Sequence, residues 1–351
     1  MAEPNFTLTN QYFALSPMVL HTEMQAGASV TLTVTATVIR KQVQVTLTAD
    51  TDGNVVYDIS PIIRDIISSR FKRENIVEDY SRSPYGIAFN TKLDNTYTLY
   101  HDVIWARASA DLLKALDNPY KAAWLLPTGK YTYRRNAPEE ILSCYAMDEM
   151  DNTIVAKNRK TGRVYDLRDQ VVSYTINIPA SLFWELPNGE YDVYLKSPGN
   201  MPLSLTVTDG CFPSDAIQDG SMAYVRFCNQ WGGISYALLQ VTQRSVKNKA
   251  TYVQKAYALD ADPEKETLYS VYPDRVMTGQ EITPSFKAGR DKLSRAELKE
   301  LQSILVSPMV DMYDAATGEW IPVYPADATV TQTNAALQEI TIDFNLNTEG
   351  F

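Results

Sequence analysis

Between residues 28 and 48 the sequence alternates between apolar and polar residues with a period of two. The apolar positions are Val30, Leu32, Val34, Ala36, Val38, Val43, Val45 and Leu47. Successive side chains of a strand point to opposite faces, so this pattern predicts two strands that each bury one face. Arg40-Lys41 interrupts the pattern and predicts a hairpin between them. The same alternation recurs at 203–207 and 340–346, which indicates a mostly β chain.

A chain of 351 residues is too long for one ordinary hydrophobic core. Strand-sized runs follow one another at short spacing, with turn signals such as Asn188-Gly189 between them. We therefore expect two to three β-sandwich (Ig-like) modules with two short helices. The expected boundaries are residues 1–136 for a sandwich with a short helix and long loops, 137–212 for a small sandwich, and 213–351 for a β-rich domain.

Two short stretches carry helix signals. Ser60-Pro61 predicts a helix start with Ser60 as the N-cap, followed by an isoleucine stripe. Ser294 and Glu297 form a capping-box pattern that opens a helix over residues 294–306. The isoleucine stripe contains Ile62, Ile63, Ile66 and Ile67, and the apolar face of the second helix contains Leu298, Leu301, Ile304 and Leu305.

Three segments are long for the loops of compact sandwiches, namely residues 72–84, 108–135 and 258–292. We expect these segments to carry contacts between subunits. Within the second, Lys130–Arg135 interleaves cations with two tyrosines. The formal charge of the chain is −10, so an edge strand with solvated charges is favoured there over a nucleic-acid patch.

The composition also limits the partners and cofactors. The negative charge argues against broad binding to nucleic acid or to anionic membranes. With three cysteines, no Cys-x-x-Cys pair and two histidines, a zinc site is not expected, and we interpret the cysteines as reduced, mostly buried thiols, with a single bridge left open. The first residues show no signal-peptide pattern and no apolar run is long enough to span a membrane, so we expect synthesis in a cytoplasm.

No catalytic motif is apparent. A Ser-His-Asp triad would need His21 or His101, and the Gly-x-Ser-x-Gly elbow is missing. We therefore expect no enzymatic activity and no cofactor. The Asp50–Asn54 string is interpreted as a hairpin turn rather than a calcium loop. Calcium binding is left open for three alternating oxygen donors in an expected exposed loop, namely Asp260, Asp262 and Glu264.

The stretch from Tyr224 to Tyr236 contains two apolar runs separated by Asn-Gln-Trp-Gly-Gly. Two glycines in a row favour a tight turn, because glycine adopts positive φ without steric cost. We expect the two runs to pair as strands. The candidate turn or interface residues are Asn229, Trp231, Gly232 and Gly233. The Trp231 ring is expected either to pack in a core or to contact a sugar or a neighbouring subunit.

Several of these strings, taken in order, resemble a known class. They are Asp58-Ile-Ser60, Arg226–Gly233, Ser294–Leu301 and Ile321-Pro-Val323, followed by the alternating final strand. The chain resembles the β-rich virion structural proteins of Bacteroides-type phages and prophages, including crAss-like phages, and among them tail or tail-tip (muzzle, baseplate) components. The resemblance implies no catalytic residues, a place in the tail region of a virion, and partners that are copies of the chain itself and neighbouring virion proteins.

Such tail components assemble by self-association, often in rings. A second hypothesis is a carbohydrate-binding or adhesin module on a phage tail or a cell surface, with a host-surface glycan as its ligand and Trp231 as the stacking residue.

Overall fold

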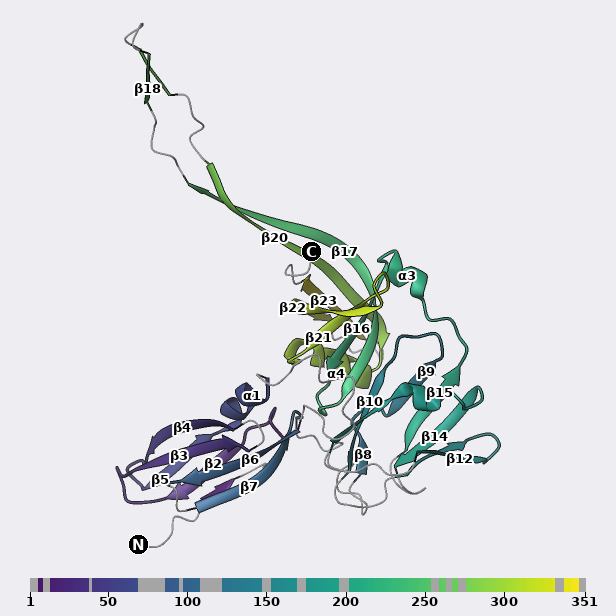
Figure 1. The fold of residues 1–351 in the computed structure, drawn as a ribbon. Coiled ribbons are helices and arrows are strands. Elements are labelled where there is room, and N and C mark those ends of the chain that lie inside the picture. Colours follow the sequence, from purple (N-terminus) through teal and green to yellow (C-terminus); the bar gives the residue numbers. More distant parts are fainter. Residues whose placement is uncertain are drawn as a thin grey trace.

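The structure, a computed structural model, describes residues 6–8, 13–37, 40–68, 86–94, 97–107, 122–146, 153–168, 175–195, 202–253, 259–262, 267–270, 276–331 and 338–346. These residues are mostly β, which confirms the expected fold class. They form three modules and a long two-stranded projection (Figure 1). We refer to the modules as the first sandwich, the second sandwich and the barrel, and to the projection as the arm.

The first sandwich packs a three-stranded sheet against a four-stranded sheet. Its strands are β1 (Phe6–Leu8), β2 (Val19–Glu23) and β5 (Asn54–Asp58) in one sheet, and β4 (Lys41–Thr48), β3 (Ser29–Ala36), β6 (Gly86–Leu93) and β7 (Tyr97–Ile104) in the other. Strands β3 and β4 pair antiparallel, as the alternation predicts. Their inward positions, among them Val30, Leu32 and Val34, are buried in one hydrophobic core.

Helix α1 (Ser60–Ser68) packs its isoleucine face into the same core, with Ile63, Ile66 and Ile67 buried. The capping differs from the sequence prediction. The carboxylate of Asp58, not the hydroxyl of Ser60, accepts hydrogen bonds from the backbone N–H groups of Met18 at 2.9 Å and Ser60 at 3.0 Å. The Asp58 carboxylate therefore satisfies a donor of the first turn and ties the helix to β2.

The second sandwich contains a three-stranded and a five-stranded sheet. The first holds β13 (Thr175–Pro179), β10 (Ile141–Ala146) and β8 (Ala122–Trp124), and the second holds β12 (Val164–Arg168), β11 (Ile154–Asn158), β14 (Gly189–Leu195), β15 (Leu203–Thr208) and β9 (Lys130–Arg134). The short 3-10 helix η2 (Ala180–Phe183) follows β13. The expected boundary at residue 136 needs correction, because β8 pairs with β10 and β9 pairs in parallel with β15.

The third module is a closed six-stranded barrel rather than a sandwich. Its order is β16 (Met222–Cys228), β17 (Ile234–Val253), β20 (Val276–Leu293), β23 (Gln338–Leu346), β22 (Glu319–Thr331) and β21 (Val310–Asp314), and β21 closes the ring on β16. The short helix α3 (Ser214–Gln218), which the sequence analysis missed, leads into β16. The closed barrel encloses one hydrophobic core, in which the ring of Phe286 stacks on that of Phe344.

Helix α4 (Arg295–Gln302) and the 3-10 turn η3 (Ser303–Val306) correspond to the predicted helix 294–306. The predicted capping box is confirmed: Ser294 and Glu297 exchange side-chain to backbone hydrogen bonds. Leu298, Leu301 and Ile304 are buried in the barrel core. Leu305 is exposed, contrary to prediction, because the last turn tightens to 3-10 geometry and moves it off the apolar face.

The arm is formed by the outer parts of β17 and β20. These strands pair with each other from Gln240 opposite Gly289 to Val253 opposite Val276. Strand β16 pairs with β17 only as far as Gln240, and β23 pairs with β20 only from Ser285. Figure 1 shows the two strands leaving the barrel together and running clear of the modules, with the β18 (Leu259–Asp262) and β19 (Thr267–Ser270) pair near the end. The predicted 258–292 loop is therefore mostly strand.

Candidate functional site

Asn229–Gly233 form the turn that joins β16 to β17. The N–H of Asn229 donates to the carbonyl of Gly233 at 2.8 Å, and the N–H of Gly232 donates to the carbonyl of Asn229 at 3.0 Å. Gly232 has a φ of 82°, in the left-handed region that favours glycine. The side-chain oxygen of Asn229 accepts from the N–H groups of Trp231 and Gly233 inside the turn.

This turn is also where the three modules meet. The carbonyl of Gln230 accepts from the N–H of Arg107, which follows the first sandwich, at 2.7 Å. The Asn229 side-chain amide donates to the carbonyl of Leu125 in the second sandwich at 2.8 Å. The N–H of Gln230 donates to Ser303, at the end of α4, at 3.1 Å. The turn therefore holds the modules together through main-chain groups and the Asn229 side chain, and we call it the junction turn.

The glycines of the junction turn allow this close approach. A Cβ atom on Gly232 would lie 2.7 Å from the carbonyl oxygen of Trp105, and one on Gly233 would overlap the carbonyl oxygen of Leu125. Trp231 is only 5% exposed, so its ring offers no free face to a sugar. The structure thus places all four candidate residues inside the molecule, in the turn and against the neighbouring modules.

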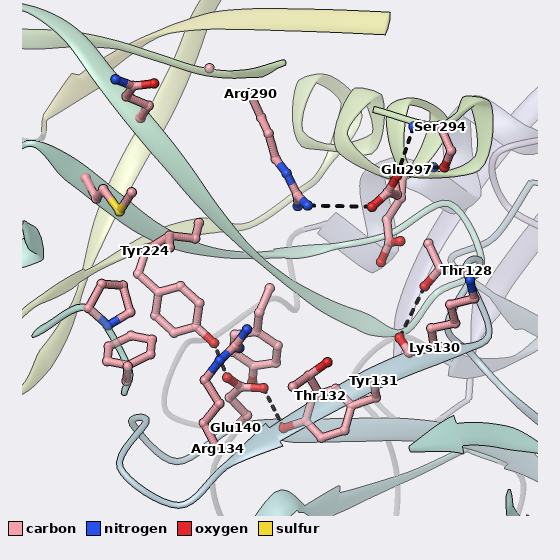
Figure 2. A pocket seen from close by; sticks show the side chains of 18 of the residues that line it. Thr128, Lys130, Tyr131, Thr132, Arg134, Glu140, Tyr224, Arg290, Ser294 and Glu297 are labelled. Carbon is pink, nitrogen blue, oxygen red and sulfur yellow. Dashed lines mark hydrogen bonds and ion pairs between the residues drawn. The ribbon is translucent and has the colours of Figure 1, made fainter. Parts of the chain in front are cut away.

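A cleft of about 1280 Å³ lies between the second sandwich and the barrel, beside the junction turn (Figure 2). Glu140 is buried at its floor. Its carboxylate accepts hydrogen bonds from the hydroxyl of Tyr131 on β9, at 2.5 Å, and from that of Tyr224 on β16. The N–H of Ile141 donates to the hydroxyl of Tyr236 on β17 at 2.7 Å. These bonds join the second sandwich to the barrel.

Burial raises the pKa of Glu140, and the two tyrosine hydroxyls only partly oppose that effect. Burial also raises the pKa of Tyr131 and of Tyr224, and the nearby Glu140 charge acts in the same direction. The tyrosines therefore stay protonated, as hydrogen-bond donors to the carboxylate.

Helix α4 supplies the acidic side of the cleft. Glu300 accepts a 2.5 Å hydrogen bond from Ser235, and burial raises its pKa while the hydroxyls of Ser235 and Thr128 act to lower it. Glu297 lies 3.5 Å from Arg290. Partial burial acts to raise the pKa of Glu297, but the hydrogen bonds from Ser294 and the Arg290 charge outweigh it and lower the pKa. Figure 2 shows Arg290, Ser294 and Glu297 on one side of the cleft and Glu140 on the other.

The arm has two chemically different faces. Residues directly opposite each other in an antiparallel pair lie on the same face. Tyr252 opposite Met277 and Val246 opposite Pro284 share one face, whereas Lys247 opposite Thr283 lies on the other. Val246, Tyr252 and Met277 are 65%, 57% and 51% exposed. We call their side the apolar face of the arm. Toward the barrel, this face leads to Phe286, which lies opposite Arg244 in the register and belongs to the barrel core.

Some other sequence candidates also lie at the cleft, which is lined by Cys211, Lys130 and Arg134. Cys144 and Cys228 are buried, Cys211 is exposed, and all three are free. Lys130–Arg134 is an edge strand, as predicted, and Arg135 is held by Asp209 and Asn188. The exposed tryptophan is Trp184, at 55%.

The turn reading of Asp50–Asn54 agrees with hydrogen bonds from two backbone N–H groups to Asp50. Among the described residues no cluster of three metal-binding side chains occurs. Asp260 and Asp262 lie on strand β18, with side chains outside the described part, as is all of Glu264. His21 lies on β2, and the side chain of His101 is likewise outside the described part. Of the helices described, none is long and apolar enough to cross a bilayer.

Sequence reasoning missed both the cleft and the arm. A weak signal for the arm exists, because Val246, Ala250 and Tyr252 occur at even spacing among polar residues. No signal distinguishes Glu140 among 42 acidic residues, since its burial follows from how two modules pack.

No family model and no curated protein matches this chain. Solved structures give weak likenesses. A tri-modular endo-β-1,4-glucanase from Bacillus licheniformis is 9% identical, with 58% of this chain and 38% of that chain covered and a TM-score of 0.20. The Dpr2 Ig1-Ig2 complex with DIP-Theta Ig1-Ig3 is 7% identical, with 59% and 100% covered and a TM-score of 0.17.

The trypsin-activated alpha-2-macroglobulin from Escherichia coli is 7% identical, with 95% and 25% covered and a TM-score of 0.20. At these scores the likenesses carry no argument about function.

Proposed function

We propose that this chain is a structural subunit that assembles with copies of itself and with neighbouring proteins, and that the assembly is the tail or tail tip of a bacteriophage virion. In this proposal the chain is made in the cytoplasm of the host bacterium and ends in the particle. The assembly part rests on the arm, and the phage part rests on the sequence resemblance.

The observation that carries the proposal is the free two-stranded arm. An isolated β-hairpin is marginally stable in water, because it has too few neighbours to bury an apolar face. Beyond the barrel the arm nevertheless keeps an apolar face that contains Val246, Tyr252 and Met277, all more than half exposed. Large apolar side chains exposed on one face are typical of an interaction site. A partner that covers this face would both order the arm and join two subunits.

The rest of the molecule is consistent with a rigid building block. Three modules are fixed to one another by the junction turn and the Glu140 hydrogen bonds. A fixed orientation between modules lets contacts made by one subunit repeat with the same geometry in the next, as a closed ring requires.

Electron microscopy and particle proteomics test the proposal together. The purified chain should form rings or larger assemblies at high concentration, and the chain should be found in the tail fraction of isolated phage particles. A chain that stays monomeric both at high concentration and within isolated particles would contradict the proposal.

A glycan-binding module is the second candidate, and one observation favours it. Trp184, next to η2, exposes more than half of its surface, and an exposed tryptophan ring is a suitable stacking platform. Saturable binding on a glycan array that is lost in Trp184→Ala would support this function. Trp231→Ala is unsuitable as that test, because Trp231 is buried.

A further inference from the structure

We infer that Glu140 is a proton-controlled latch between the second sandwich and the barrel. Its protonated side chain holds the two modules together at the floor of the cleft. When Glu140 loses the proton, this contact loosens and water from the cleft reaches it, while each module stays folded. The chain therefore carries a joint whose tightness depends on pH.

The two carboxyl oxygens of Glu140 face different modules. One accepts a 2.5 Å hydrogen bond from the hydroxyl of Tyr131, on β9 of the second sandwich. The other accepts a hydrogen bond from the hydroxyl of Tyr224, on β16 of the barrel. Figure 2 shows both bonds at the floor of the cleft. Because Glu140 is only 5% exposed, its carboxyl group bridges the two modules with little contact to solvent.

The charge on this carboxyl group decides how well the bridge tolerates burial. A protonated carboxyl group donates through its hydroxyl and accepts through its carbonyl oxygen, and a tyrosine hydroxyl can do both. The neutral form of Glu140 therefore keeps both hydrogen bonds and buries no charge. The carboxylate keeps them too, but it holds a charge away from water, which is unfavourable. Since loosening the contact hydrates that charge, ionisation of Glu140 shifts the balance toward the loosened contact.

The groups packed around Glu140 do not cancel this effect. Arg134, on β9, favours the charged form of Glu140, whereas the neighbouring Glu139 disfavours it. Burial is the largest influence, and it raises the pKa of Glu140. Four phenols nearby stay neutral and supply no positive charge, because burial raises the pKa of each: Tyr131, Tyr133, Tyr224 and Tyr236.

The opposite wall of the cleft adds negative charge. Glu297 and Glu300 project from α4, and Arg290 on β20 lies 3.5 Å from Glu297. Besides Glu140, the lining of the cleft contains four acidic and three basic side chains. An ionised Glu140 therefore joins a cleft in which acidic groups already outnumber basic ones, and like charges disfavour ionisation.

Each module has a hydrophobic core of its own, so the contact can loosen without unfolding either one. The core of the second sandwich contains Phe183 and Tyr191, and the core of the barrel contains Phe286 and Phe344. The junction turn keeps its hydrogen bond from Asn229 to the carbonyl of Leu125 in both states. It is therefore the fixed point of the joint.

Amide hydrogen exchange at Ile141 tests the inference. The N–H of Ile141 donates to the hydroxyl of Tyr236 across the same contact, so loosening exposes it to water. The exchange rate is measured by NMR on the full chain with isotope-labelled isoleucine over a pH series. Each rate is corrected for the intrinsic pH dependence of amide exchange. Ile178, in β13 of the second sandwich, is the internal control.

In the parent chain, the protection of Ile141 should fall several-fold as the pH rises through the raised pKa of Glu140, while Ile178 stays protected. Glu140→Gln is neutral at every pH and should keep Ile141 protected throughout. Glu139→Gln is the matched control, because it removes the adjacent, exposed carboxylate, and it should behave as the parent does. Tyr224→Phe removes the hydroxyl on the barrel side and should weaken the protection of Ile141 already at acid pH.

Three results would overturn the inference: protection of Ile141 that does not change with pH in the parent, the same pH dependence in Glu140→Gln as in the parent, or its loss in Glu139→Gln. Far-UV circular dichroism checks that each variant is folded. If Glu140→Gln does not fold, Tyr224→Phe decides, since full protection of Ile141 at acid pH in that variant would overturn the inference as well.

Discussion

Asn229 is the side chain whose removal should most weaken the contact between modules. The change Asn229→Ala takes away the acceptor for the N–H groups of Trp231 and Gly233 and the donor to the carbonyl of Leu125. Asn229 is fully buried. Three backbone groups would then be left without these partners inside the molecule.

The size of the effect follows from those three groups. A buried polar group left unsatisfied costs roughly 1–3 kcal/mol, so the three together should lower the free energy of unfolding by about 3–6 kcal/mol once some local relaxation is allowed. That is a large share of the ~5–15 kcal/mol that holds a typical folded protein together. With ~2 kcal/mol per M as the urea dependence, the midpoint of the affected transition should fall by about 1.5–3 M.

Urea unfolding followed by tryptophan fluorescence is a suitable assay, because Trp105 and Trp231 both adjoin the junction turn. Gln230→Ala is the matched control, since Gln230 contacts the neighbouring modules through its backbone. The control should stay within roughly 0.5 kcal/mol of the parent chain. Equal midpoints for Asn229→Ala and Gln230→Ala would refute the assignment of the turn as the element that joins the modules.

Three further predictions concern the buried groups. Because the pKa of Glu140 is raised in the folded chain, the folded chain binds the Glu140 proton more tightly than the unfolded chain does. This tighter proton binding stabilises the fold at acid pH, and the stabilisation is lost as the pH rises through the raised pKa. Glu140→Gln should therefore match the parent in acid and be more stable at neutral pH, in urea unfolding at several pH values; an unchanged pH dependence would contradict this. Asp311→Ala should cost about 3–5 kcal/mol, because it removes a 2.9 Å ion-pair partner from the buried Arg226; a loss below 1 kcal/mol in thermal unfolding would count against a structural role. Gly233→Ala should force the Leu125 backbone to move and so raise protease sensitivity between the second sandwich and the barrel, and unchanged cleavage kinetics would show that the contact is loose.

The sequence predicted those features that short-range chemistry determines. The capping box of α4 is read from four consecutive residues, and its hydrogen bonds occur as expected. The hairpin of β3 and β4 follows from period-2 alternation over adjacent strands. In both cases the partners are close in sequence, because the two strands of the hairpin follow one another directly, so the pattern is visible in the chain itself.

The features that were missed depend on long-range pairing. Strand β9 was assigned to the first module, but its partner β15 lies about seventy residues further along the chain. Residues 276–293 carry one proline, two glycines and several charges and were interpreted as part of a loop, yet Val276–Gly289 pair with β17. The partner strand overrode a weak local preference. Glu140 likewise has no distinguishing feature in the sequence, because its partner Tyr224 is placed beside it only when the barrel packs against the second sandwich.

The central claim is that the arm joins subunits, and shortening the arm tests it most directly. Residues 247–283 can be replaced by Asn-Gly, a pair that forms a tight hairpin turn between Val246 and Pro284, which face each other in the register. The molar mass of the full and shortened chains would be measured by light scattering over a range of concentrations, with far-UV circular dichroism as the check on folding. The account predicts multiples of the 39.4 kDa chain for the full protein and a folded monomer for the shortened one. A shortened chain that assembles as well as the full chain, or a full chain that is monomeric at every concentration, would contradict it.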